Sequence, residues 1–302
     1  MTALIVGNHS DGHVQAVLHA IEALGTERPL VLDGPTLQDG EFTLTQRGLT
    51  LNDTHVDAGK AHRGWLRRYA PSGWGAGIVA GSLEAAVHRS FLTLVGCIAR
   101  TGSCEWLTPI DSMLRAEDRL VQLDVAASLG VSVPRTVVTS SGEAAIDELG
   151  ERFVVKPLSL GYFVTEDGPR AVFTSELDAA TARQLNFGGA PFMAQQMVET
   201  EQHFRVVTVG ENAWLASLNA DGRPLDWRQQ DRAHREWQPD DDVCGEQALR
   251  LAKALGIGYS SQDWLGVGDD RYFIDLNPGG QWLFLPPEIS QPVTQAIAEF
   301  LS

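Results

Sequence analysis

Lysine is scarce in this chain of 302 residues, where only Lys60, Lys156 and Lys253 occur. Its 23 basic residues are outnumbered by 39 acidic ones, which leaves a formal net charge of −16. A protein that binds nucleic acid needs a basic surface to neutralise phosphates, and no run of Lys and Arg here would supply one. We therefore expect no nucleic-acid partner.

Cysteines are also few, and long apolar segments are absent. Cys97, Cys104 and Cys244 form an odd set without CxxC spacing, which argues against a disulfide framework and a zinc site. No apolar run approaches the roughly 20 residues that span a bilayer, and the start lacks the features of a secretory signal. We therefore expect a cytoplasmic protein with reduced cysteines and no membrane partner.

The sequence lacks two common nucleotide-binding loops. There is no GxxxxGK[ST], and the glycine-rich stretch 73–81 lacks GxGxxG spacing and follows no clear strand. His9 and His13 have i,i+4 spacing but no carboxylate at the offset that a metal-binding helix needs. An NAD-binding oxidoreductase is therefore the most distant of the functions considered.

Apolar periodicity predicts a mixed α/β and α+β protein. A strand at 2–6, a helix at 14–24 and a strand at 29–32 indicate that an α/β domain opens the chain. One continuous helix is expected at 113–129, and closely spaced strands follow residue 153. These changes of pattern divide the chain into an N-terminal α/β domain, a small central domain and a C-terminal sheet domain, expected at 1–112, 113–190 and 191–302.

Two acids and one amide occur on a predicted hairpin near the end of the chain. Asp275 and Asn277 are two positions apart on one strand and so share a face, and a turn at 268–270 brings Asp263 close to them. The flanking residues are apolar, and an unpaired aspartate in a buried strand is costly. Because Mg²⁺ prefers oxygen ligands, we interpret the three residues as a magnesium site, with solvated strand ends as the alternative.

Lys156 ends the apolar strand 153–157, just before a loop that reads as flexible. An inward lysine at such a position needs an anion, for which a phosphate is suitable; the alternative is an edge lysine that reaches water.

The strand at 192–198 runs into the polar residues 199–205, and its free backbone groups suit the edge of a base. Taken alone, this strand is weak evidence for a base-binding site.

These segments, in this order, resemble the ATP-grasp superfamily. Within it they are most similar to the RimK-type ligases and especially to the maturases that make graspetides, the microviridin-type ribosomal peptides. The resemblance covers nearly the whole chain and implies an ATP-grasp fold preceded by a pre-ATP-grasp α/β domain. Its most specific part is 263–282, which ends in Asn277-Pro-Gly-Gly-Gln-Trp282. Other similar segments are 65–71, 119–123 with 129–136, 204–210 and 226–228.

The resemblance implies roles for individual residues. Mg²⁺ would be held by Asp263, Asp275 and Asn277, and ATP phosphates by Lys156 and Arg119 under a loop that contains Ser159 and Gly161. The adenine and ribose would lie along a segment that includes Gln196, Met197, Val198, Glu199, Glu201 and His203. The triphosphate or an acyl phosphate would be steadied by three catalytic residues, which are Lys156, Arg205 and Arg228.

The chain departs from the family pattern at four of these positions. Arg119 replaces a phosphate-binding lysine, Asp275 replaces a glutamate, and Gln196 replaces an acidic residue at the adenine edge. His203 stands where an acidic residue normally holds the ribose, and Glu199 or Glu201 would have to substitute for it. These departures put nucleotide affinity and turnover in question.

The resemblance implies an ATP-dependent ligase that works through an acyl phosphate. It would join a carboxyl side chain of a precursor peptide to a Lys, Ser or Thr of the same peptide, whose leader segment would dock on the central domain. The alternatives are a RimK-type ligase that joins a small-molecule acid and amine or extends a protein terminus, and a degenerate ATP-grasp protein that binds peptide without turnover. The resemblance also suggests a homodimer. The acceptor and the type of bond, ester or amide, do not follow from the sequence.

Overall fold

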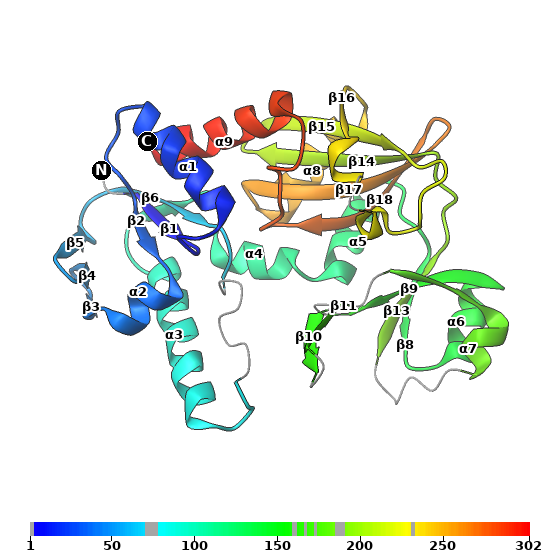
Figure 1. Ribbon diagram of the computed structural model, residues 1–302, viewed down its shortest axis with the longest axis horizontal. Helices are drawn as coiled ribbons and strands as arrows, with labels where there is room; N and C mark the ends of the chain where they lie inside the picture. Colours follow the sequence, from blue (N-terminus) through cyan, green and yellow to red (C-terminus); the bar gives the residue numbers. More distant parts are fainter. Residues whose placement is uncertain are drawn as a thin grey trace.

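The computed structural model describes residues 3–69, 78–158, 162–165, 168–171, 174–184, 191–230 and 233–302. The chain forms an N-terminal unit, a small central unit and a large C-terminal sheet, which lie at left, lower right and upper right of Figure 1. Ser159 and Gly161, which we expect above the phosphates, lie outside the described residues. Within the described ranges, no helix is long and apolar enough to cross a membrane.

The N-terminal unit is built on a parallel sheet with the order β2-β1-β6-β7. Strands β1 and β2 are short and aliphatic because helices cover the sheet, and the predicted opening strand, helix and strand are confirmed. An antiparallel meander, β3-β4-β5, lies between β2 and β6 in the chain. The elements are β1 (Leu4–Val6), α1 (Gly12–Ala23), β2 (Leu30–Leu32), α2 (Gly34–Asp39), β3 (Phe42–Thr45), β4 (Gly48–Leu51), β5 (Thr54–Asp57), β6 (His62–Leu66), α3 (Leu83–Arg100) and β7 (Cys104–Trp106).

The single helix expected at 113–129 is wrong, because the chain forms two helices there, α4 (Ile110–Ala116) and α5 (Arg119–Ser128). The break has a local cause. The side chain of Asp118 accepts hydrogen bonds from the backbone N–H groups of Leu120 and Val121, at 3.0 and 3.3 Å, and so caps a new helix. Arg119 is consequently the first helical residue of α5.

The central unit is an antiparallel sheet with the order β12-β9-β13-β8, covered on one face by two helices. Phe153 and Val155 face these helices, so by strand alternation Val154 and Lys156 face the opposite way. A two-stranded sheet, β10-β11, extends beside it. The elements are β8 (Thr136–Thr139), α6 (Gly142–Leu149), β9 (Arg152–Pro157), β10 (Tyr162–Thr165), β11 (Gly168–Ala171), β12 (Ser175–Asp178), α7 (Ala179–Gln184) and β13 (Phe192–Gln196).

The C-terminal sheet has the order β16-β15-β14-β17-β18 and is entirely antiparallel. The hairpin expected around 268–270 is confirmed, and a second hairpin joins β14 to β15 around Gly210. The elements are β14 (Gln202–Val209), β15 (Asn212–Asn219), the 3₁₀ helices η1 (Trp227–Gln229) and η2 (Ala233–Arg235), β16 (Gln238–Asp240), α8 (Cys244–Leu255), β17 (Tyr259–Val267), β18 (Asp270–Asn277) and α9 (Pro287–Leu301).

The two faces of this sheet have different functions in the fold. Phe204 and Val206 of β14 pack with α8 and α5, whereas Val207 and Val209 pack with α9. Helix α9 also packs against α1, so one apolar core joins the C-terminal sheet to the N-terminal unit (Figure 1). Strand alternation places Arg205 on the same face as Val207, and that face carries the site described below.

The cap at the start of α5 is testable. We expect Asp118→Ala to lower the free energy of unfolding by about 1 kcal/mol, because two backbone N–H groups lose their acceptor. Urea unfolding followed by circular dichroism measures the change. Asp124→Ala is the matched control, since Asp124 is exposed on the same helix and caps nothing. Equal losses in the two variants would contradict the capping role.

Candidate active site

Asp263 and Asp275 face each other on the neighbouring strands β17 and β18. They are paired in the strand register, and the ladder is irregular between Asp263 and Trp264. Trp264 packs on the α8 side of the sheet, so Asp263 points to the opposite side. Burial raises the pKa of Asp263, and the positive charge of Arg205 opposes this shift. The predicted proximity of the two carboxylates is thus confirmed.

Each carboxylate has its own arginine. Arg205 Nε lies 3.2 Å from Asp263 Oδ1, and Arg119 Nε lies 3.2 Å from Asp275 Oδ1. Arg119 also donates a hydrogen bond of 2.8 Å from Nη1 to the carbonyl of Pro157, at the end of β9. Arg119 therefore joins the central unit to the carboxylate pair, a bridge that its fork of donors permits and a lysine would not.

Asn277 follows Asp275 by two positions, and its Oδ1 accepts a hydrogen bond of 2.9 Å from the backbone N–H of Gly279. The three residues offer oxygen atoms only, which suits Mg²⁺. Among the described residues, no group of three or more His, Cys, Asp and Glu side chains could hold a metal. A site here would consist of two carboxylates and an amide, and its chemistry fits magnesium better than zinc.

Lys156 lies on the central sheet and faces Asp263 and Asp275. Its Nζ donates a hydrogen bond of 2.9 Å to Gln195 Oε1, and Gln195 Nε2 donates one of 2.9 Å to Thr136 Oγ1. Burial lowers the pKa of Lys156, whereas the charges of Asp275 and Asp263 oppose the shift. Sequence reasoning missed Gln195; a buried polar residue in the apolar strand β13 was the available signal.

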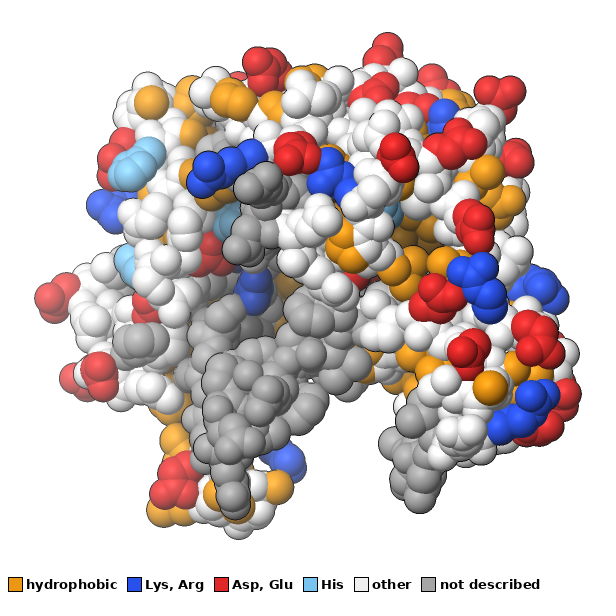
Figure 2. Space-filling model, turned by 45° about the vertical axis from the view of Figure 1, so that its right-hand side comes forward, with side chains coloured by type: hydrophobic (Ala, Val, Ile, Leu, Met, Phe, Trp, Pro, Cys, Tyr) orange, Lys and Arg blue, Asp and Glu red, His pale blue; other side chains and the backbone are white. Residues whose placement is uncertain are grey.

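A cavity with about 90 Å³ of space for water-sized molecules lies between the central and C-terminal sheets. In Figure 2, hydrophobic side chains gather in the recess between the upper body and the lower right lobe. Apolar walls with a few convergent polar groups are typical of small-molecule sites. Six of the predicted residues line the cavity, namely Lys156, Gln196, Val198, His203, Arg228 and Asp263.

Other predicted residues lie beside the cavity or away from it. Arg205, Arg119 and Asp275 adjoin it through the ion pairs described above. Glu199 Oε1 lies 3.3 Å from Arg152 Nη1, and Glu201 Oε2 accepts a 3.3 Å hydrogen bond from the backbone N–H of Gly268. Neither carboxylate is among the lining groups, nor are Met197 and Asn277.

Arg228 enters the cavity from η1, held by Asp226. Arg228 Nε and Nη2 donate hydrogen bonds of 2.7 Å to the two carboxylate oxygens of Asp226, which is buried. This bidentate pair raises the pKa of Arg228 and fixes the plane of its guanidinium. Sequence reasoning named Arg228 but assigned no function to Asp226, although both belong to the Asp226-Trp-Arg228 segment.

His203, in place of the acidic residue expected from the family pattern, is buried and neutral. Burial, with a further contribution from the positive charge of Arg223, lowers its pKa to about 4. A neutral imidazole lacks the negative charge of a carboxylate but still offers one hydrogen-bond donor and one acceptor to a ligand.

No protein-family model matches the sequence, and a search of curated proteins finds no match. Solved structures match over the whole chain. The macrocyclase MdnC from Microcystis aeruginosa MRC, bound with precursor peptide MdnA, matches with a TM-score of 0.83 and 25% identity over 99% of each chain.

Two further matches were solved with nucleotide. A RiPP-associated ATP-grasp ligase from Chryseobacterium gregarium, in complex with ADP and a leader and core peptide, has a TM-score of 0.82 and 20% identity over 100% of this chain and 96% of its own. The ATP-grasp ligase PsnB, complexed with a variant of its minimal precursor, Mg and ADP, has a TM-score of 0.76 and 18% identity over 100% and 99%.

The chain therefore has the ATP-grasp fold, as the resemblance of its motifs predicted. Its structure resembles those of ATP-grasp ligases associated with ribosomal peptides, MdnC and PsnB among them.

The neutral His203 gives a pH dependence that can be measured. Between its ordinary pKa of 6.5 and the folded value of about 4, the unfolded chain binds a proton that the folded chain does not. The free energy of unfolding should therefore fall as the pH decreases through this window, by about 3 kcal/mol in total. His203→Gln should remove this part of the pH dependence in urea unfolding, and His19→Gln, at an exposed position, should retain it. Identical pH profiles for the two variants would contradict the assignment.

Proposed function

We propose that this chain is an ATP- and Mg²⁺-dependent ligase that activates a carboxyl group of a ribosomal precursor peptide. The observation that carries the proposal is the opposition of Lys156, on the central sheet, to Asp263 and Asp275 across one cavity. Phosphates need cations on one side and a metal bridge on the other, and this arrangement offers both. The similarity to ligases solved with ADP, Mg and precursor peptides supports the same function.

Asp263, Asp275 and Asn277 would hold Mg²⁺, which would neutralise phosphate charge when bound. Lys156 and Arg119 would bind phosphate oxygens, and the adenine would lie near Gln196 and Val198. The apolar walls of the cavity would exclude water from the reacting groups. Catalysis would then rest mainly on positioning and on charge neutralisation.

In the proposed first step, a carboxylate oxygen of the peptide attacks the γ-phosphorus of ATP, and the bond from that phosphorus to ADP breaks. In the second step, a Lys amine or a Ser or Thr hydroxyl of the same peptide attacks the acyl carbon. Phosphate leaves and the nucleophile loses its proton, so that an amide or ester closes a ring. Arg228, oriented by Asp226, would stabilise the charge on the transferred phosphoryl group.

The first test is calorimetric titration with a non-hydrolysable ATP analogue, with and without Mg²⁺. We expect Mg²⁺-dependent binding, weakened about tenfold or more in Lys156→Ala and in Asp275→Ala, because each removes a charged contact. Lys253→Ala and Asp270→Ala are matched controls, since both residues are exposed and lie outside the cavity.

Two results would oppose the proposal in different ways. Full Mg²⁺ dependence in Asp275→Ala would contradict the metal assignment. Absence of nucleotide binding in the wild-type chain would favour a degenerate protein in which Arg119, Gln196, His203 and Asp275 have disabled the site.

The second test is the mass of the product after incubation with ATP, Mg²⁺ and a candidate precursor peptide. Ring closure should remove the mass of one water molecule per bond, whereas ligation of a second molecule would add mass and favour the RimK-type alternative. Arg228→Ala should lower the rate constant of ring closure by about 10²-fold, as loss of a transition-state contact does. Arg235→Ala, at an exposed position in η2, is the matched control. An unchanged rate in Arg228→Ala would exclude the proposed contact.

A further inference from the structure

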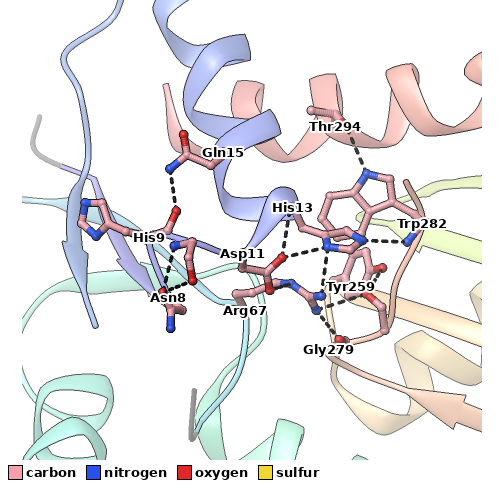
Figure 3. Close-up of polar contacts among 12 residues, drawn as sticks. Asn8, His9, Asp11, His13, Gln15, Arg67, Tyr259, Gly279, Trp282 and Thr294 are labelled. Carbon is pink, nitrogen blue, oxygen red and sulfur yellow. Dashed lines mark hydrogen bonds and ion pairs between the residues drawn. The ribbon is translucent and has the colours of Figure 1, made fainter. Parts of the chain in front are cut away.

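The segment 278–282, which directly follows Asn277, is held by side chains of the N-terminal unit. Arg67, at the end of β6, donates hydrogen bonds from Nη1 to the carbonyls of Gly279 and Gly280. His13, in the first turn of α1, accepts a hydrogen bond of 3.3 Å at Nε2 from the backbone N–H of Trp282. Figure 3 shows both side chains pointing from the N-terminal unit toward this segment.

Asp11 orients both of these side chains. Its Oδ1 lies 2.9 Å from His13 Nδ1, and its Oδ2 lies 3.1 Å from Arg67 Nε. Although burial opposes the shift, the hydrogen bonds from His13 and the charge of Arg67 hold the pKa of Asp11 well below its usual range. The carboxylate is therefore ionised and contacts both the imidazole and the guanidinium, which also approach each other, with Arg67 Nη2 at 3.3 Å from His13 Nδ1 (Figure 3).

These contacts determine the tautomer of His13. A backbone N–H can only donate, so Nε2 must carry a lone pair toward Trp282. The proton of the neutral ring is then on Nδ1, from which it is donated to Asp11 at 2.9 Å, so the 3.3 Å approach of Arg67 Nη2 to the same nitrogen brings two donors together and is not a hydrogen bond. Burial, with the nearby charge of Arg67, lowers the pKa of His13, whereas the hydrogen bond with Asp11 opposes this shift. A phenyl ring at this position would fill the same space without the acceptor.

The hollow lined by Asn8, Asp11, His13, Arg67, Arg68 and Gln281 could instead be an anion site. The contacts of Arg67 argue against that reading. Its guanidinium is 1% exposed, its charge is compensated by Asp11, and its Nη1 is directed to two carbonyls. An incoming anion would have to displace these partners. Holding the backbone segment is therefore the function that the geometry of Arg67 supports.

The held segment is coupled directly to Asn277. The N–H of Gly279 bonds to Asn277 Oδ1, and the N–H of Gly280 donates to the Asn277 carbonyl at 3.2 Å. The glycines are needed for close approach: a Cβ on Gly279 would lie 2.7 Å from the carbonyl oxygen of Arg67, and one on Gly280 would lie 2.4 Å from Ser261 Cβ. Movement of this backbone would therefore change the position of the Asn277 side chain.

We propose that Asp11, His13 and Arg67 are positioning residues for the metal site, because they hold segment 278–282 and thereby fix the Asn277 oxygen beside Asp263 and Asp275. The inference rests on the proposed function and assigns the N-terminal unit a part in it. A residue that orients a metal ligand through its hydrogen bonds typically changes metal affinity 10–100-fold when it is replaced.

The test compares His13→Phe, which keeps a ring against Trp282 but removes the acceptor, with His13→Gln, which can present an oxygen to the same N–H. Two quantities are measured: the Mg²⁺ concentration at half-maximal binding of the ATP analogue, and amide hydrogen exchange at 278–282. We expect His13→Phe to raise the Mg²⁺ midpoint about tenfold and to speed the exchange, and His13→Gln to recover most of both. His19→Phe, the same substitution at an exposed position of α1, should change neither.

A double variant separates positioning from general loss of structure. If His13 acts through Asn277, His13→Phe should add no further shift of the Mg²⁺ midpoint in an Asn277→Ala background. If His13→Phe does not fold, Arg67→Lys carries the same test, since a lysine cannot bond to Asp11 and to both carbonyls together.

The outcomes distinguish this inference from the proposed function. An unchanged Mg²⁺ midpoint in His13→Phe, with faster exchange at 278–282, would overturn the positioning role while leaving the proposed ligase intact. Additive shifts in the double variant would overturn it as well. Absence of Mg²⁺-dependent binding in the wild-type chain would overturn the proposed function, and the positioning of a metal ligand with it.

Discussion

Two carboxylates that face each other across neighbouring strands repel, and much of this molecule is arranged around that repulsion. Asp263 and Asp275 cannot both stay ionised in a partly buried place without cations nearby. Cations approach the pair from different parts of the chain: Arg205 from the adjacent strand, Arg119 from α5 and Lys156 from the central sheet. The same cluster of charges that would bind a metal and a phosphate therefore also holds the structural units together.

The three units contribute to the site in different ways. The C-terminal sheet supplies oxygen atoms on the face opposite α8, and the central sheet supplies Lys156 on the face opposite its helices. The described residues of the N-terminal unit line no part of that cavity, but they hold the backbone that follows Asn277. Because the contributions meet only at the interfaces, the geometry of the site depends on how the units are packed.

The sequence allowed the local part of this arrangement to be predicted. Apolar segments on both sides of the turn at Gly268 predict the β17–β18 hairpin, and a period of two places Asp275 and Asn277 on one face. The break before α5 was missed, because periodicity continues across it and only the Asp118 side chain marks the new start. The pairing of His13 with Trp282 joins residues 269 positions apart, and no local pattern encodes such a contact.

The packing of α9 against α1 has a consequence for biosynthesis. The apolar face of α1, with Val14, Val17 and Ile21, is buried in one core together with Ile289, Val293 and Ile297 of α9. During translation, α1 leaves the ribosome long before the helix that covers it. The N-terminal unit must therefore keep this apolar surface exposed until α9 has been synthesised, and during that interval the surface is prone to aggregation.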